Sequence, residues 1–186
     1  MTARLVVESL ADMERLAGLL AAALEPGDVL ILTGDLGAGK TTFTQFLARA
    51  MEVKGRVSSP TFVIAREHDP SGDGPGLVHV DAYRLGDADE FADLDLDSDL
   101  SEVVTVVEWG HGIAEQLSDD RLEITLTRNF EIAGEPVAVT SEDLDEYDTE
   151  DQTRVVDLVP AGESWETRVD RVSEEYLSSN RGGRNA

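Results

Sequence analysis

The sequence of 186 residues contains no cysteine, which excludes a disulfide scaffold and thiol chemistry and is typical of a reducing compartment. It also lacks long hydrophobic runs, since every apolar stretch is shorter than the roughly 20 residues that cross a bilayer. The N-terminal segment carries Asp12 and Glu14 within its apolar pattern, which is not typical of a signal peptide. We therefore predict a cytoplasmic protein with no membrane partner.

Positive charge is scarce, with 15 basic residues against 39 acidic ones and a net charge of -24. Such a surface repels polyphosphates at long range and offers no broad basic face for nucleic acid, so we expect no DNA partner. Charges beyond about 8 Å are largely screened at physiological salt, so a phosphate ligand can still be captured locally by backbone N–H groups and one or two cations. The acid excess itself is explained by solubility or by adaptation to salt.

Hydrophobic residues make up 41% of the chain, which is enough for a packed core. The length suits one domain with a tail. We predict a single domain over residues 1–176 with an acidic insert at about 140–152, followed by a disordered tail at 177–186.

Three apolar runs of similar design predict the centre of the fold: VLILTGD, which ends at Asp35, LVHVDAY, which contains Asp81, and VVTVVEW, which contains Glu108. Because they are apolar without strict alternation, they indicate strands buried on both faces of a largely parallel sheet. Ligands of such sheets lie beyond the carboxyl ends of the strands.

Further strands are predicted in RLVVES, RLEITLTR and TRVVDLVP, and helices after the first strand, in TTFTQFLARAM and in SWETRVDRVSEEYL. The predicted fold class is α/β: a three-layer fold like that of P-loop NTPases, with a mostly parallel central sheet and some antiparallel strands.

The segment GDLGAGKT satisfies the G-x-x-x-x-G-K-[ST] pattern between a predicted strand and a predicted helix. Glycines let successive N–H groups point at phosphate oxygens, and the helix adds the positive end of its dipole. Lys40 supplies a mobile charge for the β- and γ-phosphates and Thr41 a hydroxyl for Mg²⁺. A glycine-rich turn with no ligand is the alternative. The expected nucleotide contacts in this loop are Gly34, Asp35, Leu36, Gly37, Ala38, Gly39, Lys40, Thr41 and Thr42.

Asp81 and Glu108 are the carboxylates expected at neighbouring strand ends. Mg²⁺ takes one or two protein oxygens together with phosphates and waters, so one of these acids can hold the metal. The other can orient or deprotonate an attacking water. The alternative for each is that it caps a following turn.

Eight acidic residues lie between Asp87 and Glu102, in a pattern that can suggest calcium ligands. The spacing lacks the glycine and the terminal glutamate of an EF-hand loop. A solvated, helix-capping segment that faces a partner is favoured over a calcium site.

Four blocks occur in order along the chain: GDLGAGKTTF, SSPTF, HVDAYRL and VVEWG. Together they resemble the TsaE family, the small ATPases of bacterial threonylcarbamoyladenosine tRNA modification, over about residues 5–128. The resemblance implies that ATP is cradled by the glycine-rich loop, that Thr41 and Glu108 hold Mg²⁺, and that Asp81 acts with Lys40 in hydrolysis. Thr61 is the implied contact of a switch-like loop near the γ-phosphate.

The resemblance also implies that Arg154 flanks the nucleotide, while Glu14 stands where members often carry threonine on the adenine side. Trp109 and Arg84 match family residues, but strand packing and ion pairing are the structural alternatives for them. His79 is interpreted as a packing residue of its strand.

The sequence shows no machinery for a second substrate, such as an arginine-rich lid. ATPases of this kind usually act on a partner that senses the nucleotide state. The resemblance implies that this partner is the TsaB–TsaD heterodimer, with tRNA engaged indirectly. Because REHDP and HVDAYR offer no obvious arginine finger, we expect weak turnover by the ATPase alone. A small-molecule phosphotransferase and a nucleotide-gated binding module are the alternatives.

Overall fold

The computed structural model describes residues 2–92, 94, 100–128 and 153–183. Its described strands form one sheet in the order β1-β7-β6-β2-β5-β4-β3. In chain order they are β1 (Ala3–Val7), β2 (Val29–Thr33), β3 (Ala65–His68), β4 (Gly76–Asp81), β5 (Val103–Glu108), β6 (Arg121–Arg128) and β7 (Arg154–Ala161).

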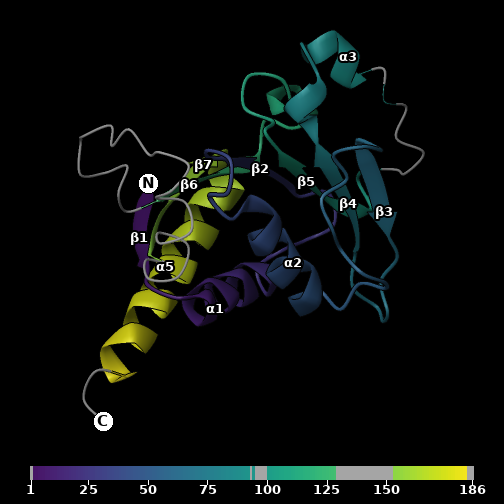
Figure 1. The fold of residues 1–186 in the computed structure, drawn as a ribbon. Coiled ribbons are helices and arrows are strands. Elements are labelled where there is room, and N and C mark those ends of the chain that lie inside the picture. Colours follow the sequence, from purple (N-terminus) through teal and green to yellow (C-terminus); the bar gives the residue numbers. More distant parts are fainter. Residues whose placement is uncertain (1, 93, 95–99, 129–152, 184–186) are drawn as a thin grey trace, which may run out of the picture.

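The centre of the sheet is parallel and its flanks are antiparallel (Figure 1). Strands β6, β2, β5 and β4 run in one direction. Strand β3 pairs antiparallel with β4, and β7 pairs antiparallel with both β6 and β1. This arrangement confirms the predicted α/β class with a mostly parallel central sheet.

The sheet register brings the carboxyl ends of the central strands together. Glu108 on β5 is paired with Asp81 on β4 and with Leu32 on β2. Since β2 ends at Thr33, the glycine-rich loop begins next to Glu108 and one strand further from Asp81. The predicted meeting of these strand ends at one edge is confirmed.

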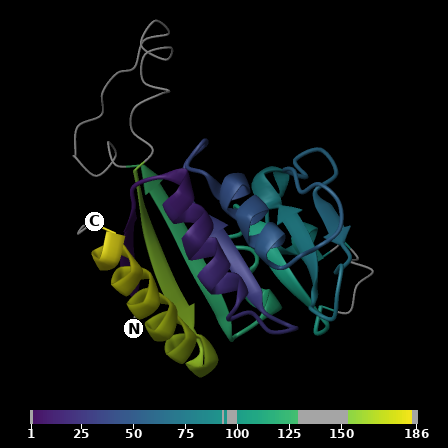
Figure 2. The ribbon, with the colours of Figure 1, turned by 90° about the horizontal axis from the view of Figure 1, so that it is seen from below.

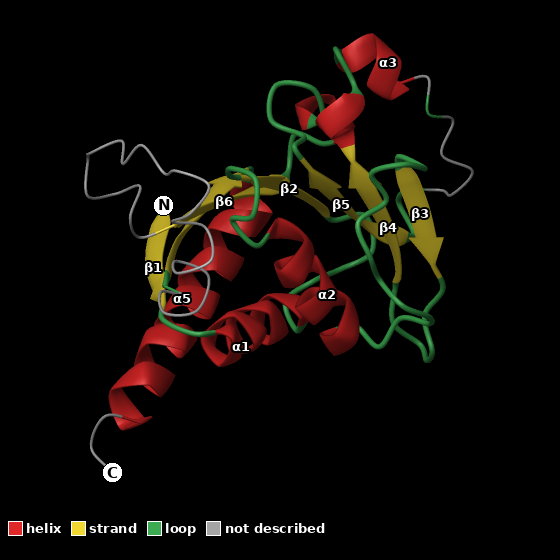
Figure 3. Cartoon of the chain, in the orientation of Figure 1, coloured by secondary structure: helices red, strands yellow, loops and turns green. Residues whose placement is uncertain are grey.

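Three long helices lie side by side across one face of the sheet (Figure 2): α1 (Leu10–Ala21), α2 (Lys40–Ala50) and α5 (Glu163–Gly183). The short helix α3 (Ala88–Ala92) lies on the other side (Figure 3), with the 3-10 turns η1 (Ala82–Arg84) and η2 (Glu115–Leu117) in the connections. Of the helices in the described part of the chain, none combines the length and hydrophobicity of a membrane span.

The core is divided by the sheet into two clusters. On β2, Leu30 and Leu32 face the cluster that includes residues of the long helices, whereas Val29 and Ile31 face the cluster that includes Phe91 of α3. Successive side chains of a strand point to opposite faces, so a strand covered on both sides must be apolar at every position. This explains the continuous apolar run in the sequence.

Two elements differ from the sequence prediction. Strand β3 was not predicted, because AREH has neither an apolar run nor an alternation that marks a strand. The prediction of a disordered tail from residue 177 is wrong as far as Gly183, since α5 continues to that residue. A helix that is already nucleated adds one hydrogen bond for each further residue, so weak helix formers can extend it. Residues 184–186 and the acidic insert at 140–152 lie outside the described residues.

A buried ion pair joins α5 to the start of β2. Both terminal nitrogens of Arg168 donate to the Asp28 carboxylate, at 2.6 Å and 2.9 Å. The side chains are only 11% and 8% exposed, and Asp28 also accepts from the Glu25 backbone N–H. The pair therefore fixes α5 against the sheet.

Replacing Arg168 with alanine is expected to lower the free energy of unfolding by about 3 kcal/mol, because it leaves the Asp28 carboxylate buried without its cation. Urea denaturation followed by circular dichroism measures the change. Arg171→Ala is the matched control, since that arginine is exposed on the same helix. Equal effects of the two substitutions would show that the ion pair contributes nothing specific.

Candidate functional site

The loop between β2 and α2 depends on its glycines. Gly34 has φ of 142°, and a Cβ there would lie 2.3 Å from the Leu126 carbonyl oxygen. Gly39 has φ of 108°, in the left-handed region that side chains disfavour. Gly39 is also the N-cap of α2 and provides no side-chain cap, so the first N–H groups of the helix can bind an anion.

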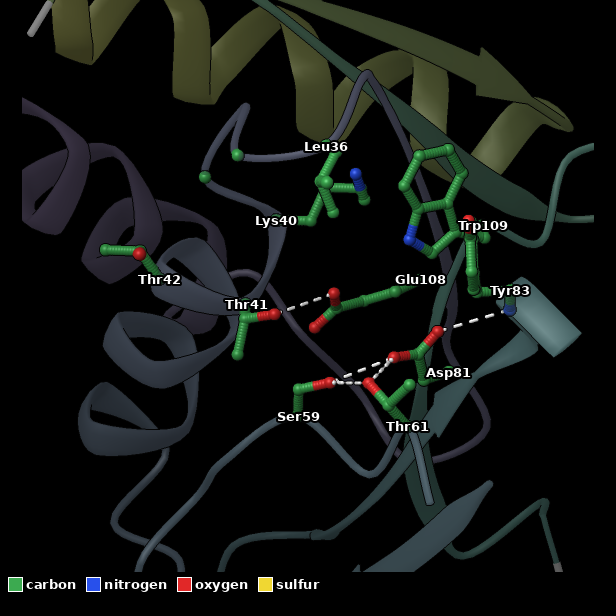
Figure 4. Close-up of a pocket in the computed structure, with 12 residues that line it drawn as sticks. Leu36, Lys40, Thr41, Thr42, Ser59, Thr61, Asp81, Tyr83, Glu108 and Trp109 are labelled. Atoms are coloured by element: carbon green, nitrogen blue, oxygen red, sulfur yellow. Dashed lines mark hydrogen bonds between the residues drawn. The ribbon is translucent and has the colours of Figure 1, made fainter. Parts of the chain in front are cut away.

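A cavity of about 430 Å³ opens over this loop (Figure 4). Its walls come from the glycine-rich loop and the start of α2, from the loop before β3, and from the ends of β4 and β5. The described lining residues are Leu36, Gly37, Gly39, Lys40, Thr41, Thr42, Ser59, Thr61, Asp81, Tyr83, Glu108 and Trp109.

Lys40 is 5% exposed and its ammonium group is held by the loop itself. Nζ donates to the carbonyl oxygens of Gly34 at 2.6 Å and Asp35 at 2.9 Å. Burial lowers the pKa of Lys40, although the negative charges of Glu108, Asp81 and Asp35 act in the opposite direction. The ammonium group thus lies within the cavity, and phosphate oxygens could replace the two loop carbonyls as its hydrogen-bond acceptors.

Glu108 is held at both of its carboxylate oxygens. Oε2 accepts a hydrogen bond from the Thr41 hydroxyl at 2.8 Å, and Oε1 lies 2.8 Å from Nε2 of His79. The histidine and glutamate side chains are 0% and 3% exposed. Two elements that are distant in sequence, the start of α2 and strand β4, therefore fix this carboxylate.

Asp81 is tied to the loop before β3 (Figure 4). Its Oδ2 lies 2.9 Å from the hydroxyl of Ser59 and 2.5 Å from that of Thr61, and the two hydroxyls lie 2.5 Å apart. Oδ1 accepts from the Tyr83 backbone N–H at 3.2 Å. These contacts orient the carboxylate at the floor of the cavity and link it to the position of the loop.

Trp109 forms the wall above Lys40. Its backbone N–H donates to the Leu32 carbonyl, and its φ of 61° is unusual for a residue with a side chain. The centroid of the indole ring lies 3.7 Å from Lys40 Nζ and 5.1 Å from the ring centroid of Tyr83. An ammonium group at this distance from a ring face is attracted by the ring quadrupole.

The comparisons with known proteins agree with the four sequence blocks. A family model described as threonylcarbamoyl adenosine biosynthesis protein TsaE matches residues 7–133. The chain belongs to the TsaE family. It is 49% identical to the TsaE protein of Streptomyces coelicolor over 156 residues, which is 83% of this chain and 95% of the relative. It is 47% identical to TsaE of Bacillus subtilis over 118 residues, 63% of this chain and 72% of the relative.

The fold agrees as well. The crystal structure of YdiB from Bacillus subtilis is similar with a TM-score of 0.65 and 30% sequence identity. The match covers 94% of this chain and 96% of that one.

Most site residues expected for a TsaE protein line the cavity. The expected residues that do so are Leu36, Gly37, Gly39, Lys40, Thr41, Thr42, Thr61, Asp81 and Glu108. Gly34, Asp35 and Ala38 are not among the described lining residues, and the first two present their carbonyls to Lys40 instead. Their contact with a nucleotide stays a prediction.

Arg154 lies behind the glycine-rich loop. Its Nε donates to the Ala38 carbonyl at 3.1 Å, and it is not among the described lining residues. Arg128, which the sequence analysis did not single out, similarly donates to the Gly37 carbonyl at 3.2 Å. Arg128 is the last residue of β6 and Arg154 the first of β7, and both stabilise the loop through its carbonyl oxygens. A direct contact of Arg154 with a nucleotide stays a prediction.

Three other positions are now placed. Glu14 forms an ion pair with Arg49 of α2 at 2.8 Å. The Arg84 guanidinium lies 4.9 Å from the Phe62 ring centroid. His79 was interpreted as a packing residue, but its contact with Glu108 makes it part of the site. A histidine two residues before Asp81 shares a strand face with it, and this spacing is the signal that could have revealed it.

Proposed function

We propose that this TsaE protein is a Mg²⁺-dependent ATPase of tRNA threonylcarbamoyladenosine biosynthesis that regulates or resets a TsaB–TsaD complex in the cytoplasm. The proposal depends chiefly on one observation: the Thr41 hydroxyl and the Glu108 carboxylate are hydrogen bonded in a cavity that Asp81 also lines. A hydroxyl at the start of the loop helix and a strand-end acid are the protein ligands of Mg²⁺ in P-loop NTPases.

The residues present fit ATP. The first turn of α2 has no side-chain cap, and within the described residues the hydrogen bonds of the Lys40 ammonium group go to carbonyl oxygens of its own loop. Backbone N–H groups, a helix N-terminus and a buried cation form a local anion site on a chain of net charge -24. Binding of the β- and γ-phosphates would transfer the lysine hydrogen bonds from the loop carbonyls to phosphate oxygens.

They fit Mg²⁺ as well. Thr41 Oγ1 and Glu108 Oε2 are hard oxygen donors 2.8 Å apart, close to the roughly 3.0 Å between neighbouring ligands of an octahedral ion with bonds of about 2.1 Å. When bound, the ion supplies charge neutralisation on the phosphate oxygens.

Asp81 is the residue that we assign to the attacking water. Its carboxylate is oriented by the Tyr83 N–H and by the hydroxyls of the loop before β3. The carboxylate can accept a proton from the attacking water, or it can orient that water toward the γ-phosphate. Among the described lining residues Lys40 is the one cation. An arginine finger contributes about 10³–10⁵ in rate to related NTPases, so we expect slow turnover by the protein alone.

Exposed apolar side chains around the cavity support a partner that senses the nucleotide. Leu36 is 83% exposed, Phe62 87% and Tyr83 61%. Leu36 and Tyr83 line the cavity, and Phe62 follows Thr61 on the loop tied to Asp81. Clustered exposed apolar residues mark interaction sites. We assign this rim to TsaB–TsaD, with tRNA engaged through that complex.

The test combines retention and product analysis. Immobilised protein is incubated with TsaB and TsaD in ATP, in ADP and without nucleotide, and free phosphate is measured in parallel. We expect retention to depend on the nucleotide and phosphate release to rise when the partners are added, with Lys40→Ala as the negative control. Phosphate found on a metabolite would indicate a phosphotransferase. Full cellular function without turnover would indicate a binding module, and equal retention in all three states would contradict partner sensing.

A further inference from the structure

The contact between His79 and Glu108 defines which nitrogen carries a proton. An ionised carboxylate only accepts hydrogen bonds, so the 2.8 Å contact to Oε1 requires a proton on Nε2. Nδ1 is buried and has no hydrogen-bond partner within the described part of the chain. A proton on Nδ1 would be a buried donor without an acceptor, which is costly, and it would leave Nε2 with no proton to donate to Oε1. The Nε2–H tautomer is therefore the one that the geometry requires.

This hydrogen bond removes a freedom that Glu108 would otherwise have. A glutamate side chain has three rotatable bonds, and its carboxylate can turn either oxygen toward the cavity. With Oε1 held by β4 from within the core, Oε2 is the oxygen that faces Thr41. The two oxygens then have distinct roles: Oε1 is anchored by His79, and Oε2 faces Thr41.

The location supports this role over simple packing. His79 is fully buried in a strand that is otherwise apolar as far as Asp81, and a leucine or valine there would fill space at lower cost. His68 provides a comparison, since it is also a buried strand histidine but its Nδ1 faces the Lys54 carbonyl, away from the cavity. Of these two buried histidines, only His79 contacts an acid.

We propose that His79 is a positioning residue that orients Glu108, through Nε2–H and Oε1, so that Oε2 and the Thr41 hydroxyl are presented together to a divalent cation. The inference rests on the proposed Mg²⁺-dependent ATP binding. Groups that orient metal ligands in this way typically contribute about 10–100-fold to metal affinity.

The test measures ATP binding by calorimetry with and without Mg²⁺ in wild type, His79→Leu and His79→Gln. We expect His79→Leu to weaken Mg²⁺ affinity by about 10–100-fold while the Mg²⁺-free affinity for ATP stays within about threefold. His79→Gln is expected to recover most of the loss, because its amide nitrogen can donate to Oε1. His68→Leu is the matched control and should leave both affinities unchanged.

A second measurement does not depend on the folding of the His79 variants. Nitrogen-15 NMR of the wild-type imidazole should show the proton on Nε2, and Glu108→Gln should shift that signal. A proton on Nδ1 would overturn the inference. So would a His79→Leu protein that keeps wild-type Mg²⁺ affinity, or one that loses Mg²⁺-free and Mg²⁺-dependent binding equally. If wild type binds ATP identically with and without Mg²⁺, the proposed function itself fails.

Discussion

Lys40→Ala is expected to reduce ATP affinity roughly 100-fold. The ammonium group now makes two hydrogen bonds to loop carbonyls, and bound phosphates would receive these donors together with the positive charge. A hydrogen bond to a charged group contributes about 1.5–3 kcal/mol, so two of them justify a loss of about 3 kcal/mol even after the carbonyl contacts are given up. Because Lys40 is the one cation among the described lining residues, no neighbour there can take its place.

Calorimetry of ATP binding measures this loss, and thermal unfolding of the same sample checks that the protein is folded. Lys54→Ala is the matched control, since Lys54 is the only other lysine of the sequence and is exposed away from the cavity. Unchanged ATP affinity in Lys40→Ala would place the phosphates elsewhere.

Asp81→Asn is expected to lower ATP turnover by about 10²–10⁴-fold, the range that a positioned general base contributes. The amide keeps the shape of the carboxylate, and its oxygen can still accept from the Thr61 hydroxyl, so the loop and the cavity should persist. ATP affinity should then stay within about threefold of wild type, because Asp81 is not assigned to the phosphates or the metal.

Phosphate release under single-turnover conditions, in the presence of TsaB and TsaD, separates this effect from binding. Asp73→Asn, an exposed acid in the turn before β4, serves as the control. A variant that keeps wild-type turnover would remove Asp81 from the chemistry. A variant that loses ATP binding in proportion would reassign it to nucleotide or metal binding.

The convergence of the two acids could be predicted from the sequence because it depends on strand direction alone. Asp81 and Glu108 each end an apolar run, and the carboxyl ends of parallel strands share one edge of a sheet. The glycine-rich loop could be predicted for a similar reason, since its pattern encodes the backbone conformation that it needs.

Features that depend on tertiary contacts could not be predicted. The spacing of His79 and Asp81 places both on one strand face, but the contact between His79 and Glu108 also requires the register of β4 against β5, which no local pattern specifies. The left-handed backbone of Trp109 is one that residues with a side chain rarely adopt, and it is stabilised here by the bond to Leu32 on another strand. Arg128 contacts the loop across 91 positions of sequence.

The strand order has a consequence for synthesis of the chain. Strand β2, which ends at the glycine-rich loop, lies between β5 and β6 in the sheet. Both of these strands are synthesised after β2, within about the next hundred residues of the chain. Its first hydrogen-bonded neighbour is complete at Glu108 and its second at Arg128. A nascent chain that has emerged only through α3 therefore contains the whole GDLGAGKT motif but neither of the strands that pair with β2. The proposed nucleotide site is therefore incomplete until the later strands have been synthesised, and the apolar β2 segment has no strand partner until then.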